Sequence, residues 1–577
     1  MLYNRRSLFA QVTKTPIFAL HIYPEGVTMI SLRLYLIISM AALMPFAAAQ
    51  GPYIPPDKPK LVIGVVVEQL RFDQLEKARS LLTANGIRRL INEGTYYRNA
   101  HFKYMLIQGA PGYATIYTGA EPSLHGIPSD RWYEPLSRNL IEATEDMSVR
   151  ATGGSYQNGK HSAANLLATT FSDELKLASN GISRSFSVGF KNYSAVLGGG
   201  HTSDGAFWFD DQTGTWMSST FYMEQLPGWV VDFNAMQHAS QYLSKVWNPL
   251  LVRDRYYMAL PDSASSGELR GVNGFPYDLD KMSRRGLISR TRDYSLLAET
   301  PFSNSLTTDF VLKLIEEEGM GKGQGTDFIA IAYNANDNIG HRFGPSSVES
   351  YDALLRLDRE IERLLDRLND SLGKQNILLF FTAAHGVSEV PSVLQQNRIP
   401  AGRFRQNQAL SLLRTYLNAL YGEGDWIRGY HERQIFLNRT LIEDARIPLD
   451  EIQRVVARFI VQFSGVSAAY PFSAFESGSF SNGHMMRISN NFSPVRSGDV
   501  IVVLHPGWID NSDYLADHGS PFGYDSHVPL IWYGWSVNRA TIHRRINMTG
   551  VAATISAILG IPMPNASDSE LLEEILR

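Results

Sequence analysis

The sequence predicts an α/β fold in which a mostly parallel central sheet is flanked by helices. Two observations support this prediction: unbroken apolar runs of strand length recur along the chain, and a long amphipathic helix separates two of them. Strands buried on both faces are apolar throughout, and a strand–helix–strand order produces parallel neighbours. A chain of 577 residues is long enough to bury a large core and to carry insertions.

Four segments carry the strand signal: Leu61 to Val67, Phe328 to Tyr333, Ile377 to Phe381 and Val528 to Tyr533. Each is a short apolar run of the kind found in buried parallel strands. Between the second and third, Ser347 to Leu372 repeats apolar residues at helical spacing and places charges on the opposite face. This order predicts two parallel strands joined by a helix that covers the sheet.

Two stretches interrupt this alternation of strands and helices and are predicted to be insertions. Residues 206 to about 300 are rich in aromatics and open with a β-hairpin pattern at 206–217 around a polar turn, which suggests an inserted cap. Residues 400 to about 490 hold two helical patterns, Ala409 to Tyr421 and Leu449 to Phe463, together with short strands. The second stretch is therefore expected to form a small α+β insertion. The aromatics of the first are expected to form the core of the cap more than a recognition surface.

The N-terminal segment indicates export. From Met29 the chain has a basic residue, a short apolar stretch and the small residues Ala47, Ala48 and Ala49 before Gln50. This order is typical of a secretory signal cleaved near Ala49, and the stretch is short for a membrane anchor, which is the alternative. We therefore expect translation to begin at Met29, residues 1–49 to be removed, and the mature chain to be periplasmic and to lack a membrane span.

Composition excludes several function classes. The formal net charge is −4 and no basic run is present, so nucleic acid is not an expected partner. The chain has no cysteine, which excludes disulfides, thiolate metal sites and a lipoprotein anchor.

Polar residues with useful chemistry follow the predicted strands, where open α/β sheets bind their ligands. Asp337 and His341 are four residues apart after one strand, so a helical turn would direct both toward one point. His385 follows another strand, and the segment from His518 to His527 precedes the last. An isolated Asp-x-x-x-His pair is more often a surface or capping pair, but several such loops at strand ends favour a site.

The chain resembles the alkaline phosphatase superfamily, in the branch that contains the nucleotide pyrophosphatase/phosphodiesterases and related periplasmic bacterial alkaline phosphatases. The resemblance covers nearly all of residues 58–577. Its motifs lie at Val65 to Asp73, Pro111 to Gly119, His125 to Ile127, Asp337 to Gly344, Thr382 to Gly386 and His518 to His527. It implies a single phosphatase-like domain and a pair of zinc ions that clamp a phosphoryl group.

The resemblance indicates that the ligands of one of the two zinc sites are retained. The family binds one zinc through Asp-x-x-x-His and a distant histidine, positions that match Asp337, His341 and His527. We therefore expect one zinc ion there.

The other half is altered at several positions. The resemblance places Glu68 where the family has an aspartate and Ala384 where the carboxylate beside His385 belongs. Its nucleophilic threonine aligns with Gly109, and its oxyanion-holding asparagine aligns with Asp130. We expect the second zinc site, of which Glu68 and His385 are remnants, to be lost.

The charge clamp is also incomplete. Of the Lys-x-Arg pair that binds the non-transferred oxygens in the phosphomonoesterase branch, Lys191 is present, but Tyr193 replaces the arginine and cannot grip two oxygens. Each such loss typically costs about 10² to 10³ in rate.

Two function classes follow. In the first, the chain is a pseudoenzyme that lacks the two-zinc threonine reaction. It is then an exported binding or scaffold module that holds an unidentified protein or small molecule through the old cleft, the cap or the aromatic surface. In the alternative, it is a divergent phosphomonoesterase or phosphodiesterase that uses a single zinc ion and a metal-bound water, with Glu68 as general base. Metal content and turnover distinguish the two classes.

Overall fold

The computed structural model describes residues 57–134, 139–260, 267–284, 292–475, 480–510 and 513–576. The predicted export signal lies outside these residues. Within the described part of the chain, no helix combines the length and the apolar character needed to cross a bilayer.

The central element is an 11-stranded sheet in the order β20-β2-β19-β12-β1-β11-β6-β7-β8-β5, with β21 paired to β2. The five strands from β12 to β7 are parallel, whereas β19 and β8 run antiparallel to their neighbours. The strands, in sheet order, are β20 (Ala540–Ile542), β2 (Thr95–His101), β19 (His527–Gly534), β12 (Ile377–Ala383), β1 (Leu61–Val67), β11 (Asp327–Tyr333), β6 (Ser185–Gly189), β7 (Gly205–Asp210), β8 (Thr215–Ser219), β5 (Ala151–Thr152) and β21 (Ile546–Asn547).

This sheet confirms the predicted fold class. All four predicted strands are present as β1, β11, β12 and β19, and the predicted helix is α14 (Val348–Ser371). Val67, the last residue of β1, pairs with Tyr333 on one side and Ala383 on the other. Three parallel strands therefore end at the same level, and the residues that follow them share one edge of the sheet.

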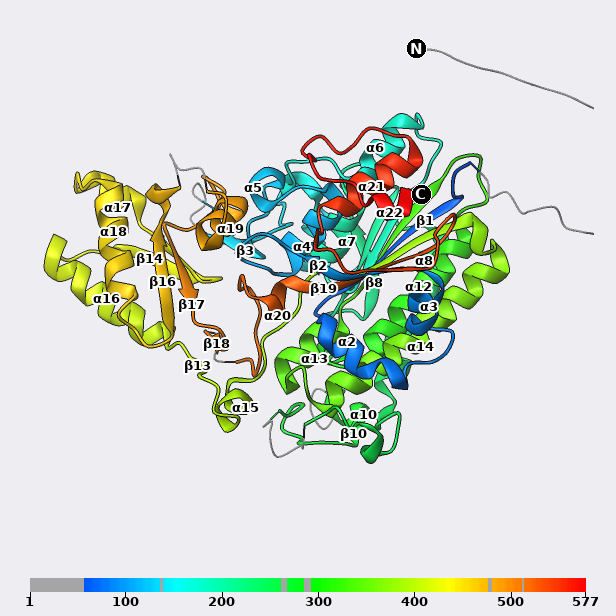
Figure 1. Ribbon diagram of the computed structural model, residues 1–577, viewed down its shortest axis with the longest axis horizontal. Helices are drawn as coiled ribbons and strands as arrows, with labels where there is room; N and C mark the ends of the chain where they lie inside the picture. Colours follow the sequence, from blue (N-terminus) through cyan, green and yellow to red (C-terminus); the bar gives the residue numbers. More distant parts are fainter. Residues whose placement is uncertain are drawn as a thin grey trace, which may run out of the picture. The chain divides into compact units, whose positions relative to one another are not determined.

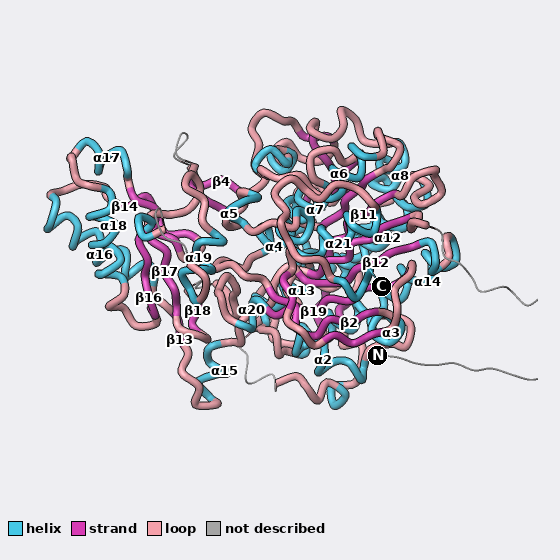
Figure 2. Tube along the Cα trace, turned by 45° about the horizontal axis from the view of Figure 1, so that its top comes forward, coloured by secondary structure: helices cyan, strands magenta, loops and turns pink. Residues whose placement is uncertain are grey.

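Helices cover the two faces of the sheet (Figures 1 and 2). One layer contains α4 (Gly109–Thr118), α6 (Phe171–Ala178), α7 (Asn192–Gly199) and α21 (Gly550–Leu559), and the other contains α3 (Ile87–Glu93), α12 (Phe302–Glu317), α13 (Ala335–Phe343) and α14. Shorter elements complete the core: α2 (Phe72–Ala78), α5 (Pro122–His125), β3 (Arg131–Tyr133), β4 (Leu140–Glu142), α15 (Pro391–Gln396), α20 (Gly523–Ser526) and α22 (Glu573–Leu576).

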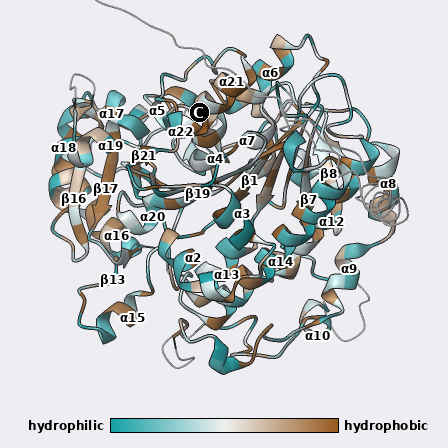
Figure 3. Cartoon of the chain, turned by 45° about the vertical axis from the view of Figure 1, so that its right-hand side comes forward, coloured by the Kyte–Doolittle hydropathy of each residue, from teal (hydrophilic) through white to brown (hydrophobic). Residues whose placement is uncertain are grey.

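The hydrophobic core lies along the central strands. Every residue of β1, β11 and β12 is buried, and Figure 3 shows β1 in the hydrophobic colour. Burial on both faces explains why these strands are apolar throughout instead of alternating.

The hairpin predicted at 206–217 is present as β7 and β8, but it does not begin a separate cap. Both strands belong to the central sheet, and Trp216 stacks on Phe310 of α12 with ring centroids 4.5 Å apart. Phe207, Phe209 and Trp216 of this hairpin therefore belong to the main core, whereas Trp208 packs in a smaller cluster. Short elements follow it: α8 (Gly228–Ala235), α9 (His238–Leu243), β9 (Val246–Trp247), β10 (Tyr277–Asp278), α10 (Leu279–Ser283) and α11 (Ser295–Ala298).

The second predicted insertion forms an α+β module with its own hydrophobic cluster. Its four-stranded sheet has the order β14-β15-β17-β16 and lies beside the core in Figure 1. Because β17 ends at Leu504, the module continues beyond the predicted end near residue 490. Its elements are β13 (Gly402–Arg403), α16 (Gln406–Tyr421), β14 (Ile427–His431), β15 (Gln434–Leu437), α17 (Arg439–Asp444), α18 (Leu449–Ile460), β16 (Val466–Pro471), α19 (Gly483–Asn491), β17 (Val500–Leu504) and β18 (Trp508–Ile509).

Trp216→Ala is expected to lower the free energy of unfolding by about 3 to 5 kcal/mol, because it leaves a cavity in the main core. Denaturant unfolding followed by circular dichroism measures the change, and Tyr156→Ala, at a side chain that is 66% exposed, is the control. An unchanged transition of the core would indicate that the hairpin belongs to an independent cap.

Candidate functional site

The candidate site lies where β1, β11 and β12 end. Glu68, Asn334 and Ala384 immediately follow these strands, and α13 begins at Ala335. Ligand sites of parallel sheets occur at this carboxyl edge. A cavity of about 660 Å³ opens here between the sheet edge and the α+β module. Of the predicted site residues, Asp130, Lys191, Tyr193, Asp337 and His341 line this cavity. Glu68, Gly109 and His385 are buried and are not among its lining residues.

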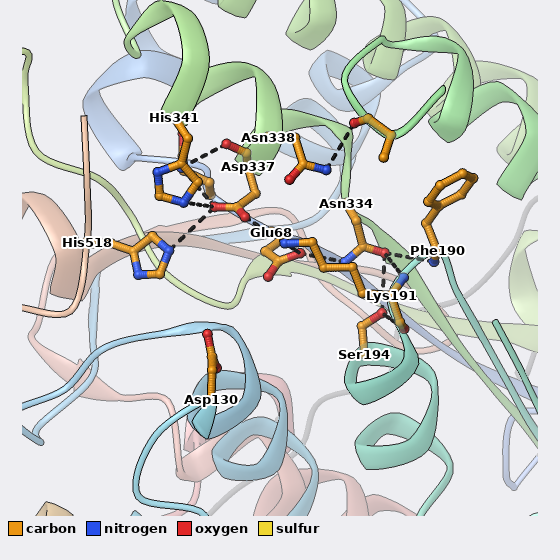
Figure 4. A network of polar contacts seen from close by, with 12 residues as sticks. Glu68, Asp130, Phe190, Lys191, Ser194, Asn334, Asp337, Asn338, His341 and His518 are labelled. Carbon is orange, nitrogen blue, oxygen red and sulfur yellow. Dashed lines mark hydrogen bonds and ion pairs between the residues drawn. The ribbon is translucent and has the colours of Figure 1, made fainter. Parts of the chain in front are cut away.

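Three side chains form a first metal-ligand group: Asp337, His341 and His518. The Nε2 atoms of His341 and His518 lie 3.2 Å and 3.5 Å from Asp337 Oδ1 (Figure 4). Asp337 and His341 are one helical turn apart on α13, as the spacing predicted. All three line the cavity.

The prediction of His527 as the third ligand is wrong in this structure, because His518 takes that position. His527 begins β19, and its ring stacks between Phe72 and His101 with centroid distances of 4.4 Å and 4.5 Å. Its Nε2 donates a hydrogen bond to the Arg98 carbonyl at 2.8 Å. Strand pairing with β2 thus fixes His527 away from Asp337, whereas the loop before β19 carries His518 into the cavity.

The residues around the first group hold its ligands in a metal-binding orientation. His341 donates from Nδ1 to the Ala516 carbonyl at 2.8 Å, which leaves Nε2 free to act as a ligand. Gln69 donates from Nε2 to Asp337 Oδ1 at 2.9 Å. Gln69 has φ = 63°, and its Oε1 occupies the space where a side chain at Gly340 would begin. This strained backbone therefore serves to orient Asp337.

The first group fits one divalent metal ion. One carboxylate and two imidazoles are a common donor set for zinc. Burial, followed by the charge of His385, holds the pKa of His518 well below its usual value, so this ring is neutral as a ligand must be. Burial opposes protonation of His341, but Asp337 outweighs it and raises the pKa of His341 to about 9. A proton and a metal ion therefore compete for this nitrogen.

A second group consists of Glu68, Asp337 and His385. His385 Nε2 is buried, lies 3.9 Å from a carboxylate oxygen of each partner, and makes no hydrogen bond within the described part of the chain. The Lys191 ammonium, however, lies 2.7 Å from Asp337 Oδ2 and 3.2 Å from Glu68 Oε2. Burial, the largest effect, opposes ionisation of Glu68, but Lys191 and His385 together lower the Glu68 pKa. Because Ala384 adds no ligand atom, this group fits a metal ion less well than the first.

Glu68 is held by further donors. Asn334 donates from Nδ2 to Glu68 Oε2 at 2.6 Å, and Tyr193 donates from its hydroxyl to Glu68 Oε1. Asn334 Oδ1 accepts from the Phe190 amide at 2.8 Å, which connects β11 to the start of α7. The carboxylate is therefore ionised, buried and fixed on both oxygens.

The space beside Gly109 is filled by other side chains. A Cβ atom at Gly109 would lie 2.5 Å from Glu68 Oε1 and 2.7 Å from Tyr193 Oη. Contacts this short do not occur in folded proteins, so the glycine, the longer acid at 68 and the tyrosine at 193 depend on one another. A larger side chain at 109, the position that the resemblance assigns to the nucleophile, would therefore displace Glu68 or Tyr193.

Asp130 occupies the amino end of helix α4. Its Oδ1 accepts a hydrogen bond from the Ala110 amide at 2.7 Å. Helix amino ends bind anions through such amides, so this carboxylate stands where a phosphoryl oxygen could otherwise bind. Burial raises the pKa of Asp130 to about 6.

The tip of the β14–β15 hairpin closes the cavity from the α+β module. Glu432 and Arg433 both have positive φ, 50° and 58°, at a turn where glycine and asparagine are usual. Gln108, the residue before α4, donates a hydrogen bond to Glu432, while Arg433 Nε lies 3.3 Å from Asp510. Positive φ at both central positions is typical of two-residue hairpin turns, and this turn places both charged residues at the cavity.

Comparisons with known proteins agree with this architecture. Residues 62–525 match the family model described as type I phosphodiesterase / nucleotide pyrophosphatase. The chain belongs to this family. It is 34% identical to alkaline phosphatase PhoV of Synechococcus elongatus over 526 residues, which cover 90% of this chain and 93% of PhoV. It is 32% identical to alkaline phosphatase PafA of Elizabethkingia meningoseptica over 527 residues, which cover 90% and 95% of the two chains.

The crystal structure of wild-type PafA superposes with a TM-score of 0.84 at 31% identity, covering 91% of this chain and 100% of PafA. Membership of the family, and the fold, are therefore established. Catalytic inactivity, which the sequence favoured, is not supported by these relatives, because both are named as phosphatases.

Sequence reasoning missed four contributors to the candidate site: Gln69, Asn334, Glu432, and His518 as a candidate ligand. Asn334 directly follows a predicted strand and Gln69 lies two residues after another. Their place at strand ends indicated that they lie near the site, but it did not predict what they do there. Glu432 carried no signal, because only the fold of the module brings it to the cavity.

Gly109→Thr, which restores a threonine at the nucleophile position, is expected to lower the free energy of unfolding by about 1 to 3 kcal/mol and to yield no gain in hydrolysis. The reason is overpacking against Glu68 and Tyr193. Chemical denaturation measures the loss, with Gly228→Thr, at a glycine that has open space beside it, as the control. In Gly109→Thr/Tyr193→Ala the combined loss should be smaller than the sum of the single losses, and additive losses would contradict the contact.

Glu432→Gln is expected to make thermal stability less dependent on pH between about 5 and 8. Burial, followed by Asp130, raises the Glu432 pKa from 4.5 to about 8, so the folded chain binds this proton more tightly than the unfolded chain. The stability from Glu432 is thus present below pH 4.5 and lost as the pH rises through about 8. Melting temperatures of the variant and the wild type across this range test the assignment. Parallel curves would contradict it.

Proposed function

We propose that this chain is an exported, divergent phosphoesterase of the family that works with one divalent metal ion. The observation that carries the proposal is the convergence of Asp337, His341 and His518 at the cavity, with His341 oriented by the Ala516 carbonyl. Histidines that bind metal ions typically donate their other ring N–H to such a carbonyl. The alkaline phosphatase names of the two relatives support phosphoesters as the substrate class.

The chemistry is divided among the residues of the cavity. When bound, a divalent metal ion supplies charge stabilisation for a phosphoryl group. Lys191, whose ammonium lines the cavity, can bind a second phosphoryl oxygen. Asp130, with a pKa of about 6, is largely ionised at neutral pH and weakens anion binding at the α4 amino end.

The attacking group cannot come from residue 109, because glycine has no nucleophilic side chain. The nucleophile is therefore water or another hydroxyl of the cavity. The loss of the clamp arginine and the loss of a metal-binding carboxylate each typically lower the rate by about 10² to 10³. We therefore expect turnover well below that of an enzyme that has both groups.

A second candidate function is binding of a ligand without turnover. The position of Asp130 favours it, because a carboxylate at the amino end of α4 competes with any bound phosphoryl group for the Ala110 amide. In this candidate the cavity would hold a ligand that lacks a phosphoryl group at that position.

Hydrolysis of 4-nitrophenyl phosphate and bis(4-nitrophenyl) phosphate by the purified mature chain, with zinc added or chelated, tests the proposed function. We expect slow turnover that requires the metal ion, together with one zinc ion per chain by inductively coupled plasma mass spectrometry. If the wild-type chain turned over no faster than the His341→Ala variant, the proposed phosphoesterase activity would be overturned and ligand binding without turnover would be favoured.

The identity of the third ligand is tested by a matched pair of histidine variants. His518→Ala is expected to weaken zinc affinity by more than about 100-fold, because it removes one of three ligands, whereas His527→Ala should leave the affinity unchanged. Competition titration with a chromophoric chelator measures both. The reverse pattern would restore His527 as the ligand.

A further inference from the structure

We propose that Tyr193 is the nucleophile of this chain and that Glu68 is its general base, a proposal that rests on the proposed function. The tyrosine would replace, from a different element, the hydroxyl that residue 109 does not provide. Both residues stand at positions where the resemblance predicted other side chains.

The position of the Tyr193 hydroxyl is the first observation. Its Oη lies 2.7 Å from the point where a Cβ at residue 109 would stand. A threonine Oγ is about one bond length from its Cβ, so the tyrosine hydroxyl lies close to the space that a threonine side chain at residue 109 would need. Tyr193 lines the cavity together with Asp337, His341 and His518. A phosphoryl group bound in this cavity would therefore share it with the Tyr193 side chain.

The contact with Glu68 is the second observation. Tyr193 donates its hydroxyl proton to Glu68 Oε1, and Glu68 is fixed by Asn334 and Lys191 on its other oxygen. A nucleophile, a base within hydrogen-bond reach and a third group that orients the base are the recurring parts of covalent catalysis. Tyrosine with a carboxylate is used in this way by sialidases.

The reaction balances in two steps. In the first, Tyr193 Oη forms a bond to phosphorus, the bond to the leaving oxygen breaks, Glu68 takes the phenolic proton, and the leaving oxyanion takes a proton from solvent. In the second, water attacks phosphorus from the vacated side and gives a proton to solvent, while Glu68 returns its proton to Oη as the phosphorus–Oη bond breaks. The products are an alcohol and inorganic phosphate, and the protein is regenerated.

Acid quench of the zinc-loaded chain during turnover of 4-nitrophenyl phosphate, followed by peptide mass spectrometry, tests the proposal, because a phosphotyrosine survives the quench. We expect phosphate on the Tyr193 peptide. Tyr193→Phe, which removes only the hydroxyl, should lower turnover by more than about 100-fold. Tyr117→Phe, at a buried tyrosine on α4 outside the cavity, is the matched control and should retain turnover. Glu68→Gln keeps an acceptor for the hydroxyl but removes the base, and should also abolish the label.

The outcomes separate the two proposals. Wild-type turnover that persists in a folded Tyr193→Phe variant, with no label on Tyr193, overturns the nucleophile and leaves the phosphoesterase with water. A label without turnover supports the nucleophile and overturns the phosphoesterase. The absence of both the label and turnover would overturn both proposals. Melting temperatures confirm that each variant is folded.

Discussion

The site depends on the register between β1 and its two parallel neighbours. Val67 pairs with Tyr333 and with Ala383, so the chain leaves all three strands at one level. A shift of one residue in either pairing would turn each following side chain to the opposite face of the sheet. Complete burial of the three strands is what holds this register, because slippage would break a contiguous core.

Buried charge is the second constraint. Glu68 and Asp337 are almost fully buried, and two carboxylates so close would be costly without compensation. Lys191 pairs with both, and Asn334 and Gln69 donate further hydrogen bonds. A buried pair of this kind stabilises little by itself, but removal of one partner is costly because it leaves an unpaired charge. The ammonium thus supplies, within the protein, part of the positive charge that a second metal ion would bring.

The replaced residues form one arrangement in space although they are far apart in the chain. Gly109, Glu68 and Tyr193 come from the start of α4, the end of β1 and the start of α7. The space beside Gly109 is occupied by the Glu68 carboxylate and the Tyr193 hydroxyl, so the three positions pack against one another. Proteins tolerate volume-conserving exchanges of this kind best. The same rearrangement places a hydroxyl beside a carboxylate at the cavity.

The sequence by itself determined the fold class, the four central strands, the long helix α14 and the existence of an α+β module. These features depend on local periodicity and on burial of both sheet faces, which leave a direct imprint on residue type. It also identified Asp337 and His341 as candidate metal ligands, because they lie one helical turn apart.

Only the tertiary structure decided whether His518 or His527 is the third candidate metal ligand. The pairing of β19 with β2 holds His527 away from Asp337, and the sequence does not show this pairing. It also decided that β7 and β8 extend the central sheet, since an edge hairpin and a cap hairpin share one sequence pattern. The contacts of Tyr193 with Glu68 and of Gln108 with Glu432 join segments more than a hundred residues apart. No local pattern encodes such contacts, because they arise from packing of elements that the sequence specifies separately.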